Sequence, residues 1–134
     1  MKNKKIFDVL FRLAEDQPKV AAAKVAAVLI YKGDIVSFGF NSYKTHPFHK
    51  RFSAKEDKIS LHAETSVVCK AVKRISLEKI SKSTLFVCRM KFDMKKISIW
   101  GLAKPCVGCQ RAIAQFNIRK VLYSEEGIGN YSFL

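Results

Sequence analysis

Two short stretches of the sequence carry residue types that bind metals and move protons. The first is Leu61-His62-Ala63-Glu64, and the second runs from Lys104 to Cys109 and contains the motif Pro-Cys-Val-Gly-Cys. Histidine nitrogen and cysteine sulfur are preferred zinc ligands, and three protein ligands leave the fourth position of a tetrahedral zinc ion open for water. That arrangement is typical of a catalytic site. We therefore expect His62, Cys106 and Cys109 to bind Zn²⁺.

The spacing of the two cysteines favours a common metal ion. Cys106 and Cys109 are three residues apart, so on a helix both sulfur atoms face the same side. The amino terminus of a helix also stabilises a thiolate, which is the form that binds a metal. Pro105 is well suited to the first position of such a helix, which we expect to end near Asn117.

Glu64 is the candidate catalytic residue. Zinc lowers the pKa of a coordinated water to near neutrality, and a neighbouring carboxylate can then take its proton, pass it to a substrate nitrogen and later protonate a departing amine. Glu64 follows His62 by two residues, and on a regular helix two such side chains point to opposite sides. The motif therefore requires His62 to precede the helix, where the backbone is not yet helical.

Hydrophobic periodicity predicts the elements that position these residues. Helical spacing favours an amphipathic helix over residues 4–15 and a second helix from near His62 to about Arg74, and β-branched runs favour strands. Together they indicate an α/β fold with helices on both faces of a sheet. The strands are predicted at 25–31 and 35–40, joined by a tight turn containing Gly33, at 85–88 and 120–124, with a brief extended piece at 97–100 and a tail at 127–134.

The length and composition are those of one soluble globular domain. The chain has 134 residues, 49% of them hydrophobic and 27% charged, which suits a single domain over 1–134 with a core at about 20–125. Its longest apolar run, residues 25–31, is too short to span a membrane. The basic start imitates a signal peptide, but Asp8 and Arg12 interrupt the required apolar segment. We expect a cytoplasmic protein, either bacterial or, if viral, in the host cytoplasm.

The charge balance favours an anionic partner. Lysine and arginine number 25 against 11 acidic residues, a net charge of +14. A phosphorylated nucleotide or a single-stranded nucleic acid would match this charge, although a lysine-rich solvated surface would also explain it. The long polar connection 41–60 carries Lys44 and Arg51, which are candidates for binding a 5′-phosphate. His46 and His49 in the same connection are either exposed or ligands of a second metal.

His62-Ala63-Glu64 and Pro105 to Cys109 form the His-x-Glu and Pro-Cys-x-x-Cys signature of zinc nucleobase deaminases. With it, the chain from about Val25 to Ser124 resembles the cytidine and deoxycytidylate deaminase superfamily, most closely the deoxycytidylate (dCMP) deaminases. The resemblance implies a three-layer α/β/α fold with a five-stranded mixed sheet, zinc at the starts of two helices, and Glu64 as the proton shuttle.

The resemblance also implies substrate contacts and assembly. Gly39-Phe40-Asn41 is similar to the Gly-aromatic-Asn strand end of the family, which implies that Asn41 contacts the sugar or base. The backbone at Ala63 would face the base. Relatives are commonly homo-oligomers, so the same is expected here.

Three functions remain open from the sequence. The first is hydrolytic deamination of a cytosine nucleotide, with dCMP favoured, and the second is deamination of cytosine or adenine in single-stranded DNA, RNA or tRNA. The third is a basic nucleic-acid-binding protein with a structural zinc, in which Cys69 and Cys88 would complete a four-cysteine site. Otherwise we expect Cys69 and Cys88 to fill core space.

Overall fold

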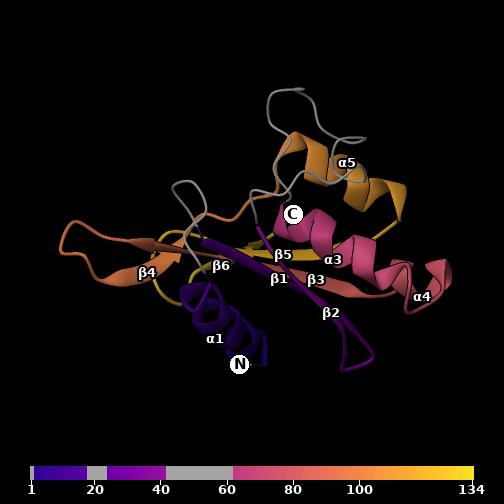
Figure 1. The fold of residues 1–134 in the computed structure, drawn as a ribbon, viewed down its shortest axis with the longest axis horizontal. Helices are drawn as coiled ribbons and strands as arrows, with labels where there is room; N and C mark the ends of the chain where they lie inside the picture. Colours follow the sequence, from indigo (N-terminus) through magenta and orange to yellow (C-terminus); the bar gives the residue numbers. More distant parts are fainter. Residues whose placement is uncertain (1, 18–23, 42–61) are drawn as a thin grey trace.

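The centre of the fold is a mixed sheet of six strands (Figure 1). The computed structural model describes residues 2–17, 24–41 and 62–134. Its main strand order is β2-β1-β3-β5-β6, and β4 pairs with the carboxyl-terminal half of β3. β3 and β5 are parallel, whereas every other pair is antiparallel. The strands are β1 (Lys24–Tyr31), β2 (Asp34–Phe40), β3 (Thr84–Phe92), β4 (Ser98–Gly101), β5 (Lys120–Ser124) and β6 (Tyr131–Phe133).

Helices cover both faces of this sheet, as the sequence predicts (Figure 1). Alternate residues of β1 point to opposite faces: Ala27 and Leu29 belong to one core cluster, and Ala26 and Val28 to the other. The first cluster lies under α3 (Ala63–Ala71), α4 (Leu77–Ser81) and α5 (Val107–Gln115), and the second lies under α1 (Lys2–Glu15). None of the described helices is both long and apolar enough to cross a membrane.

The core under α1 is built around aromatic rings. Phe7 stacks on Tyr131 at 5.0 Å between ring centroids and lies 5.4 Å from the Trp100 ring. Trp100 is only 1% exposed in this cluster, so it belongs to the core. The contacts tie α1 to both β4 and β6, which are distant in the sequence.

The carboxyl-terminal part of α3 and the turn after it hold the outer edge of β2. Lys70 Nζ donates a hydrogen bond to the carbonyl oxygen of Phe38 at 2.9 Å, and Arg74 donates one to that of Val36 at 2.7 Å. β2 is the terminal strand of the sheet order. Two carbonyls of this strand, those of Phe38 and Val36, therefore already have charged donors.

The helix predicted from His62 to about Arg74 ends earlier, at Ala71. Beyond that residue the amide of Lys73 bonds to the carbonyl of Lys70, and that of Arg74 to Ala71. These bonds span three residues rather than four, so the last turn tightens and stops the α-helix. The short helix α4, which the sequence analysis did not predict, then begins with Ser76 as its N-cap.

The carboxyl-terminal tail contains a further strand. Residues 127–134 were predicted as a tail, but β6 pairs antiparallel with β5. Gly127 and Gly129 both have positive φ, near 91°, which lets the chain reverse between the two strands. The sheet thus has six strands where the resemblance implied five.

Candidate metal centre and active site

His62 is the N-cap of α3. Its backbone is extended, with φ −86° and ψ 154°, which is the non-helical start that the His-x-Glu spacing requires. Its carbonyl oxygen accepts hydrogen bonds from the Ser66 amide at 3.0 Å and from the Thr65 hydroxyl at 3.1 Å. These bonds hold His62 where the loop meets the helix. The direction of its imidazole is therefore not set by the helical spacing that applies to the residues after it.

Cys106 occupies the equivalent position on α5. It is the N-cap, with φ −69° and ψ 172°, and its carbonyl accepts from the Gln110 amide at 2.8 Å. Pro105 therefore precedes the N-cap, and the prediction that it is the first helical residue was wrong. The Gln110 side chain donates to the carbonyl of Pro105 at 2.8 Å, which holds the Pro-Cys segment against the helix.

Ser124 holds the approach to Cys106. Its carbonyl accepts from the Ala103 amide at 2.9 Å, and its hydroxyl donates to the carbonyl of Gly101 at 2.7 Å. The same hydroxyl accepts from the Arg89 amide at 3.1 Å. This fully buried residue lies where β3 passes from pairing with β5 to pairing with β4, and it directs the chain from β4 toward the metal centre.

The two helix starts bring His62, Cys106 and Cys109 together. His62 Nδ1 lies 3.3 Å from Cys109 Sγ and 3.4 Å from Cys106 Sγ, and all three atoms lie within 4.8 Å of one another. Tetrahedral zinc with bonds of about 2.1 Å to nitrogen and 2.3 Å to sulfur separates its ligand atoms by roughly 3.6 to 3.8 Å. The observed spacing and donor set therefore fit Zn²⁺.

Glu64 is buried beside this cluster. It lies in the first turn of α3, is 7% exposed, and makes a side-chain hydrogen bond with Cys109. Burial raises its pKa, while its backbone amide and the neighbouring His62 act in the opposite direction. The amino terminus of a helix stabilises an anion. Burial therefore favours the protonated form of Glu64, and the helix terminus favours its ionised form.

The two thiols share a proton unequally when no metal is bound. The hydrogen bond with Cys109, aided by His62, lowers the pKa of the exposed Cys106 to about 3. The pKa of Cys109 is raised by its hydrogen bond with Cys106 and by burial. Cys106 is thus the thiolate and Cys109 the thiol of the metal-free pair.

The end of β2 lies directly against the start of α3. A β-carbon on Gly39 would be 2.4 Å from the carbonyl oxygen of Ala63, so only glycine allows this approach. Asn41, two residues on, accepts a hydrogen bond from the Val25 amide through its side-chain oxygen at 2.9 Å. Ala63 lies between His62 and Glu64, and Asn41 follows the Gly39 contact by two residues, whereas Lys44, Arg51, His46 and His49 lie outside the described residues.

The four-cysteine alternative does not form. Cys88 is fully buried in the cluster under α1, on the other face of the sheet from α3 and α5, and Cys69 is partly buried on α3. Within the described residues the only metal-binding group is His62, Cys106 and Cys109. The expectation that Cys88 fills core space is thereby confirmed.

Sequence reasoning missed the residues that hold the ligands in place. Thr65, Gln110 and Ser124 make the hydrogen bonds described above, and none of them belongs to a metal-binding motif. Gln110 had no clear signal, because helix amino termini leave N–H groups unpaired, whereas Gln110 donates to a carbonyl that precedes the helix. Ser124 had none, because its partners are far away in the sequence.

Comparison with known proteins agrees with this geometry. The family described as "Cytidine and deoxycytidylate deaminase zinc-binding region" matches residues 1–125, whereas a search of curated proteins gave no significant match. Among solved structures, the dCMP deaminase of cyanophage S-TIM5 in apo form is 26% identical, with a TM-score of 0.59, covering 93% of this chain and 81% of that one.

Two further structures are similar. The same cyanophage enzyme in complex with dCMP and dUMP is 26% identical with a TM-score of 0.57, covering 93% of this chain and 79% of that one. Cytidine deaminase from Burkholderia pseudomallei shares the fold, with a TM-score of 0.63 at 14% identity, covering 100% of this chain and 92% of that one. The matched family, together with a site that fits zinc, shows that this chain belongs to the zinc-dependent cytidine and deoxycytidylate deaminases.

Proposed function

We propose that this chain converts dCMP and water to dUMP and ammonia. The supporting observation is that His62 Nδ1 and the sulfur atoms of Cys106 and Cys109 lie within 4.8 Å of one another, beside the buried Glu64. A similar enzyme, the dCMP deaminase of cyanophage S-TIM5, has been solved with dCMP and dUMP. That enzyme motivates the choice of a mononucleotide.

The reaction is a hydrolysis and needs no oxidant or reductant. Zinc held by His62, Cys106 and Cys109 would supply a water that ionises near neutral pH. Glu64 takes a proton from the attacking water and delivers it to the ring nitrogen N3. This proton transfer accompanies formation of the carbon–oxygen bond at C4. Glu64 then takes the second proton from the new C4 hydroxyl and gives it to the amino group, which leaves as ammonia as the carbon–nitrogen bond breaks and the C4 carbonyl forms. Its burial excludes bulk water, which would otherwise compete for these protons.

Substrate contacts come from three parts of the chain. We propose that the backbone of Ala63, at the amino end of α3, faces the base, and that Asn41 contacts the sugar or base from the end of β2. Gly39 supports this assignment, because it brings the end of β2 within contact of Ala63. Lys44 and Arg51 are proposed to hold the 5′-phosphate through charge-assisted hydrogen bonds.

The wider setting is proposed in the same way. We expect a single deaminase domain that acts in the cytoplasm as a homo-oligomer. Single-stranded nucleic acid is the alternative substrate, motivated by the net charge of +14.

A substrate panel tests the proposal. The zinc-loaded protein is incubated with dCMP, dCTP, cytidine, deoxycytidine and a cytosine-containing oligonucleotide, and the uracil products are separated by chromatography. Turnover of dCMP at the highest kcat/KM supports the mononucleotide proposal. Turnover of the oligonucleotide alone would overturn it in favour of a polynucleotide substrate. Absence of any product, with tight nucleic-acid binding that weakens with salt, would favour a structural zinc.

A further inference from the structure

A cavity of about 540 Å³ lies at the end of the sheet that is remote from the metal centre. Four of its lining residues are lysines: Lys2, Lys32, Lys82 and Lys120. We call it the distal cavity. β1 pairs with β3 from Lys24↔Met90 at one end to Ile30↔Thr84 at the other. The metal centre lies at the Lys24 end, where Asn41 bonds to Val25, and the distal cavity includes Ile30 and Thr84.

The sheet topology brings the four lysines together. β3 and β5 are parallel and in register at Thr84↔Lys120, so both strands begin at this end. Lys82 precedes β3 by two residues, and Lys32 lies in the turn between β1 and β2 beside the same edge. Lys2 is the first residue of α1, and this helix packs against one face of the sheet. Residues far apart in the sequence thus place four lysines around one hollow.

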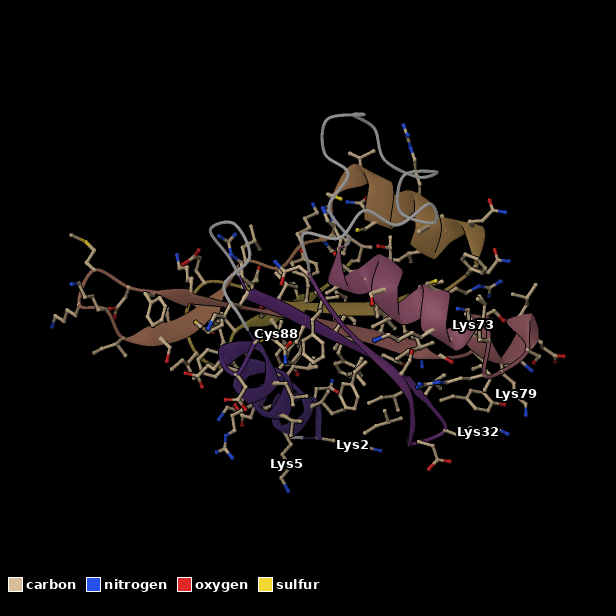
Figure 2. The ribbon with its side chains drawn as sticks, viewed as in Figure 1. Lys2, Lys5, Lys32, Lys73, Lys79 and Cys88 are labelled. Atoms are coloured by element: carbon tan, nitrogen blue, oxygen red, sulfur yellow. The ribbon has the colours of Figure 1, made fainter. Side chains whose placement is uncertain are left out.

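These charges are poorly compensated. No carboxylate lines the distal cavity. Within the described residues only Lys82 of the four has an ion pair, an exposed contact of 3.2 Å with Glu78. In Figure 2, Lys2 and Lys32 extend from α1 and from the β1–β2 turn at the same end of the molecule. Clustered like charges raise the local positive potential and favour an anion.

Lys32 occupies a backbone position that lysine rarely adopts. Its φ is 49° and that of Gly33 is 83°, the geometry of a two-residue hairpin turn in which asparagine, aspartate or glycine is preferred at the first position. A lysine there carries a conformational cost. The side chain is exposed, and its ammonium group lies 5.5 Å from the centroid of the Tyr31 ring.

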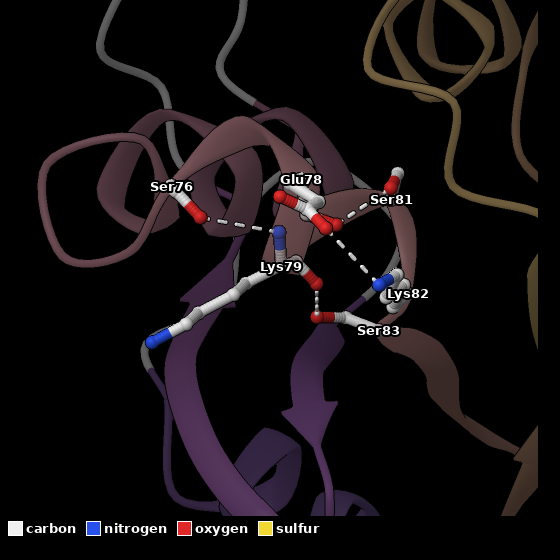
Figure 3. A network of polar contacts seen from close by, with 6 residues as sticks. All are labelled: Ser76, Glu78, Lys79, Ser81, Lys82 and Ser83. Atoms are coloured by element: carbon white, nitrogen blue, oxygen red, sulfur yellow. Dashed lines mark hydrogen bonds and ion pairs between the residues drawn. The ribbon is translucent and has the colours of Figure 1, made fainter.

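Lys82 is held by a network around α4 (Figure 3). The Ser76 hydroxyl caps the helix by accepting from the Lys79 amide at 3.3 Å, and the Ser83 hydroxyl donates to the carbonyl of Lys79 at 2.8 Å. Glu78 accepts from Lys82 on the same turn. The network fixes the short segment that enters β3 and so fixes the position of Lys82 beside the cavity.

We propose that the distal cavity binds an oligophosphate, meaning a short chain of linked phosphate groups, either free or as part of a small molecule. An ammonium group binds phosphate as a point charge, and several lysines around one hollow match a compact, multiply charged anion. A single phosphate would leave much of the positive charge uncompensated. A nucleic-acid strand would instead require cations along an extended groove.

Calorimetric titration of the zinc-loaded protein with inorganic tripolyphosphate tests this proposal. We expect one tripolyphosphate bound per chain, more tightly than inorganic phosphate, and weakening as salt is raised. Lys32→Asn and Lys120→Gln should each weaken binding about fivefold. Lys32→Asn suits its positive φ, so the fold is retained. The zinc content is measured before and after titration, so that metal extraction is not mistaken for binding.

Lys96→Asn is the matched control. Lys96 also has a positive φ, 62°, but it lies in the turn between β3 and β4, away from the distal cavity. An equal loss of affinity for Lys96→Asn and Lys32→Asn would overturn the proposal, because net charge alone would then explain binding. Equal affinity for phosphate and tripolyphosphate would overturn it as well. Binding of a single-stranded oligonucleotide that depends on Lys32, with no binding of tripolyphosphate, would assign the surface to nucleic acid instead.

Discussion

Gly39 and Ala63 are in contact through their backbones, with no room for a side chain between them. A β-carbon at residue 39 would lie 2.4 Å from the carbonyl oxygen of Ala63 and 2.8 Å from the amide nitrogen of Val67. The carbonyl belongs to the residue between His62 and Glu64. The position of β2 is therefore coupled directly to the proposed metal ligand and to the proposed proton carrier.

Gly39→Ala should displace the start of α3 and weaken the metal centre. The added methyl meets backbone atoms that cannot rotate away, so we expect a destabilisation of about 1 to 3 kcal/mol and a loss of zinc affinity. Thermal unfolding and zinc content would report the two effects. Gly101→Ala is the control, because its β-carbon meets the flexible side chains of Arg89 and Lys91 at 3.2 Å. Equal effects in both variants would contradict the coupling.

Glu64→Gln should abolish proton transfer and leave zinc bound. The amide has nearly the same shape but cannot carry a proton between water and substrate, so kcat should fall by about 10²- to 10⁴-fold. Steady-state assays with dCMP, together with zinc analysis, separate chemistry from metal loss. Glu126→Gln makes the same change on an exposed residue outside the metal-binding group and should leave kcat unchanged. Activity that survives Glu64→Gln would remove Glu64 from its proposed role.

Removal of zinc by a chelator should expose one reactive cysteine. Cys106 is exposed and, without metal, its pKa is lowered to about 3, so it remains a thiolate at pH 6, where an ordinary thiol with a pKa of about 8.5 is protonated. Cys88 is fully buried and burial raises its pKa to about 12, so it should react only on unfolding. Alkylation at pH 6 followed by peptide mass spectrometry measures both rates.

The same metal removal should lower the melting temperature. A ligand that binds only the folded state at a hundredfold excess over its Kd adds about 2.7 kcal/mol, which corresponds to a shift of roughly 10 °C in a domain of this size. Returning zinc should restore both the melting temperature and the protection of Cys106. Alkylation of Cys106 at the same rate with and without zinc would argue against its assignment as a ligand.

Asn41 should serve both structure and substrate binding, and two substitutions separate these roles. Asn41→Ala leaves the Val25 amide without its acceptor and should cost about 1 kcal/mol of stability. Asn41→Asp keeps an oxygen acceptor for Val25, so stability should be largely retained, while a carboxylate facing the nucleotide should raise KM for dCMP. An unchanged KM in Asn41→Asp would restrict Asn41 to its structural role.

Local patterns predicted the reaction centre because its chemistry depends on residue type and short spacing. The extended backbone at His62 follows from the need to place His62 and Glu64 on one site. The hairpin around Gly33 and the amphipathic helix α1 are likewise encoded by nearby residues. The location of the metal centre at the starts of α3 and α5 was implied by the family resemblance and agrees with the structure.

Features that depend on contacts between residues far apart in the chain could not be predicted from the sequence. The tail around Gly127 and Gly129 has the composition of a loop, and β6 becomes a strand only because β5 offers it a free edge. Pro105 was placed two positions too far into its helix, because the backbone of Cys106 is extended and the helix begins only at Val107. The proposed phosphate contacts at Lys44 and Arg51 fall outside the described residues and remain predictions.

The bonds from Lys70 and Arg74 to the edge of β2 have a consequence for assembly. A second chain that added a strand at this edge would need the carbonyl oxygens of Phe38 and Val36, which already accept from these two cations. It would also have to bring a second chain of net charge +14 against the displaced cations. We therefore expect the sheet to remain closed to extension at β2, and copies of this chain to associate through other surfaces.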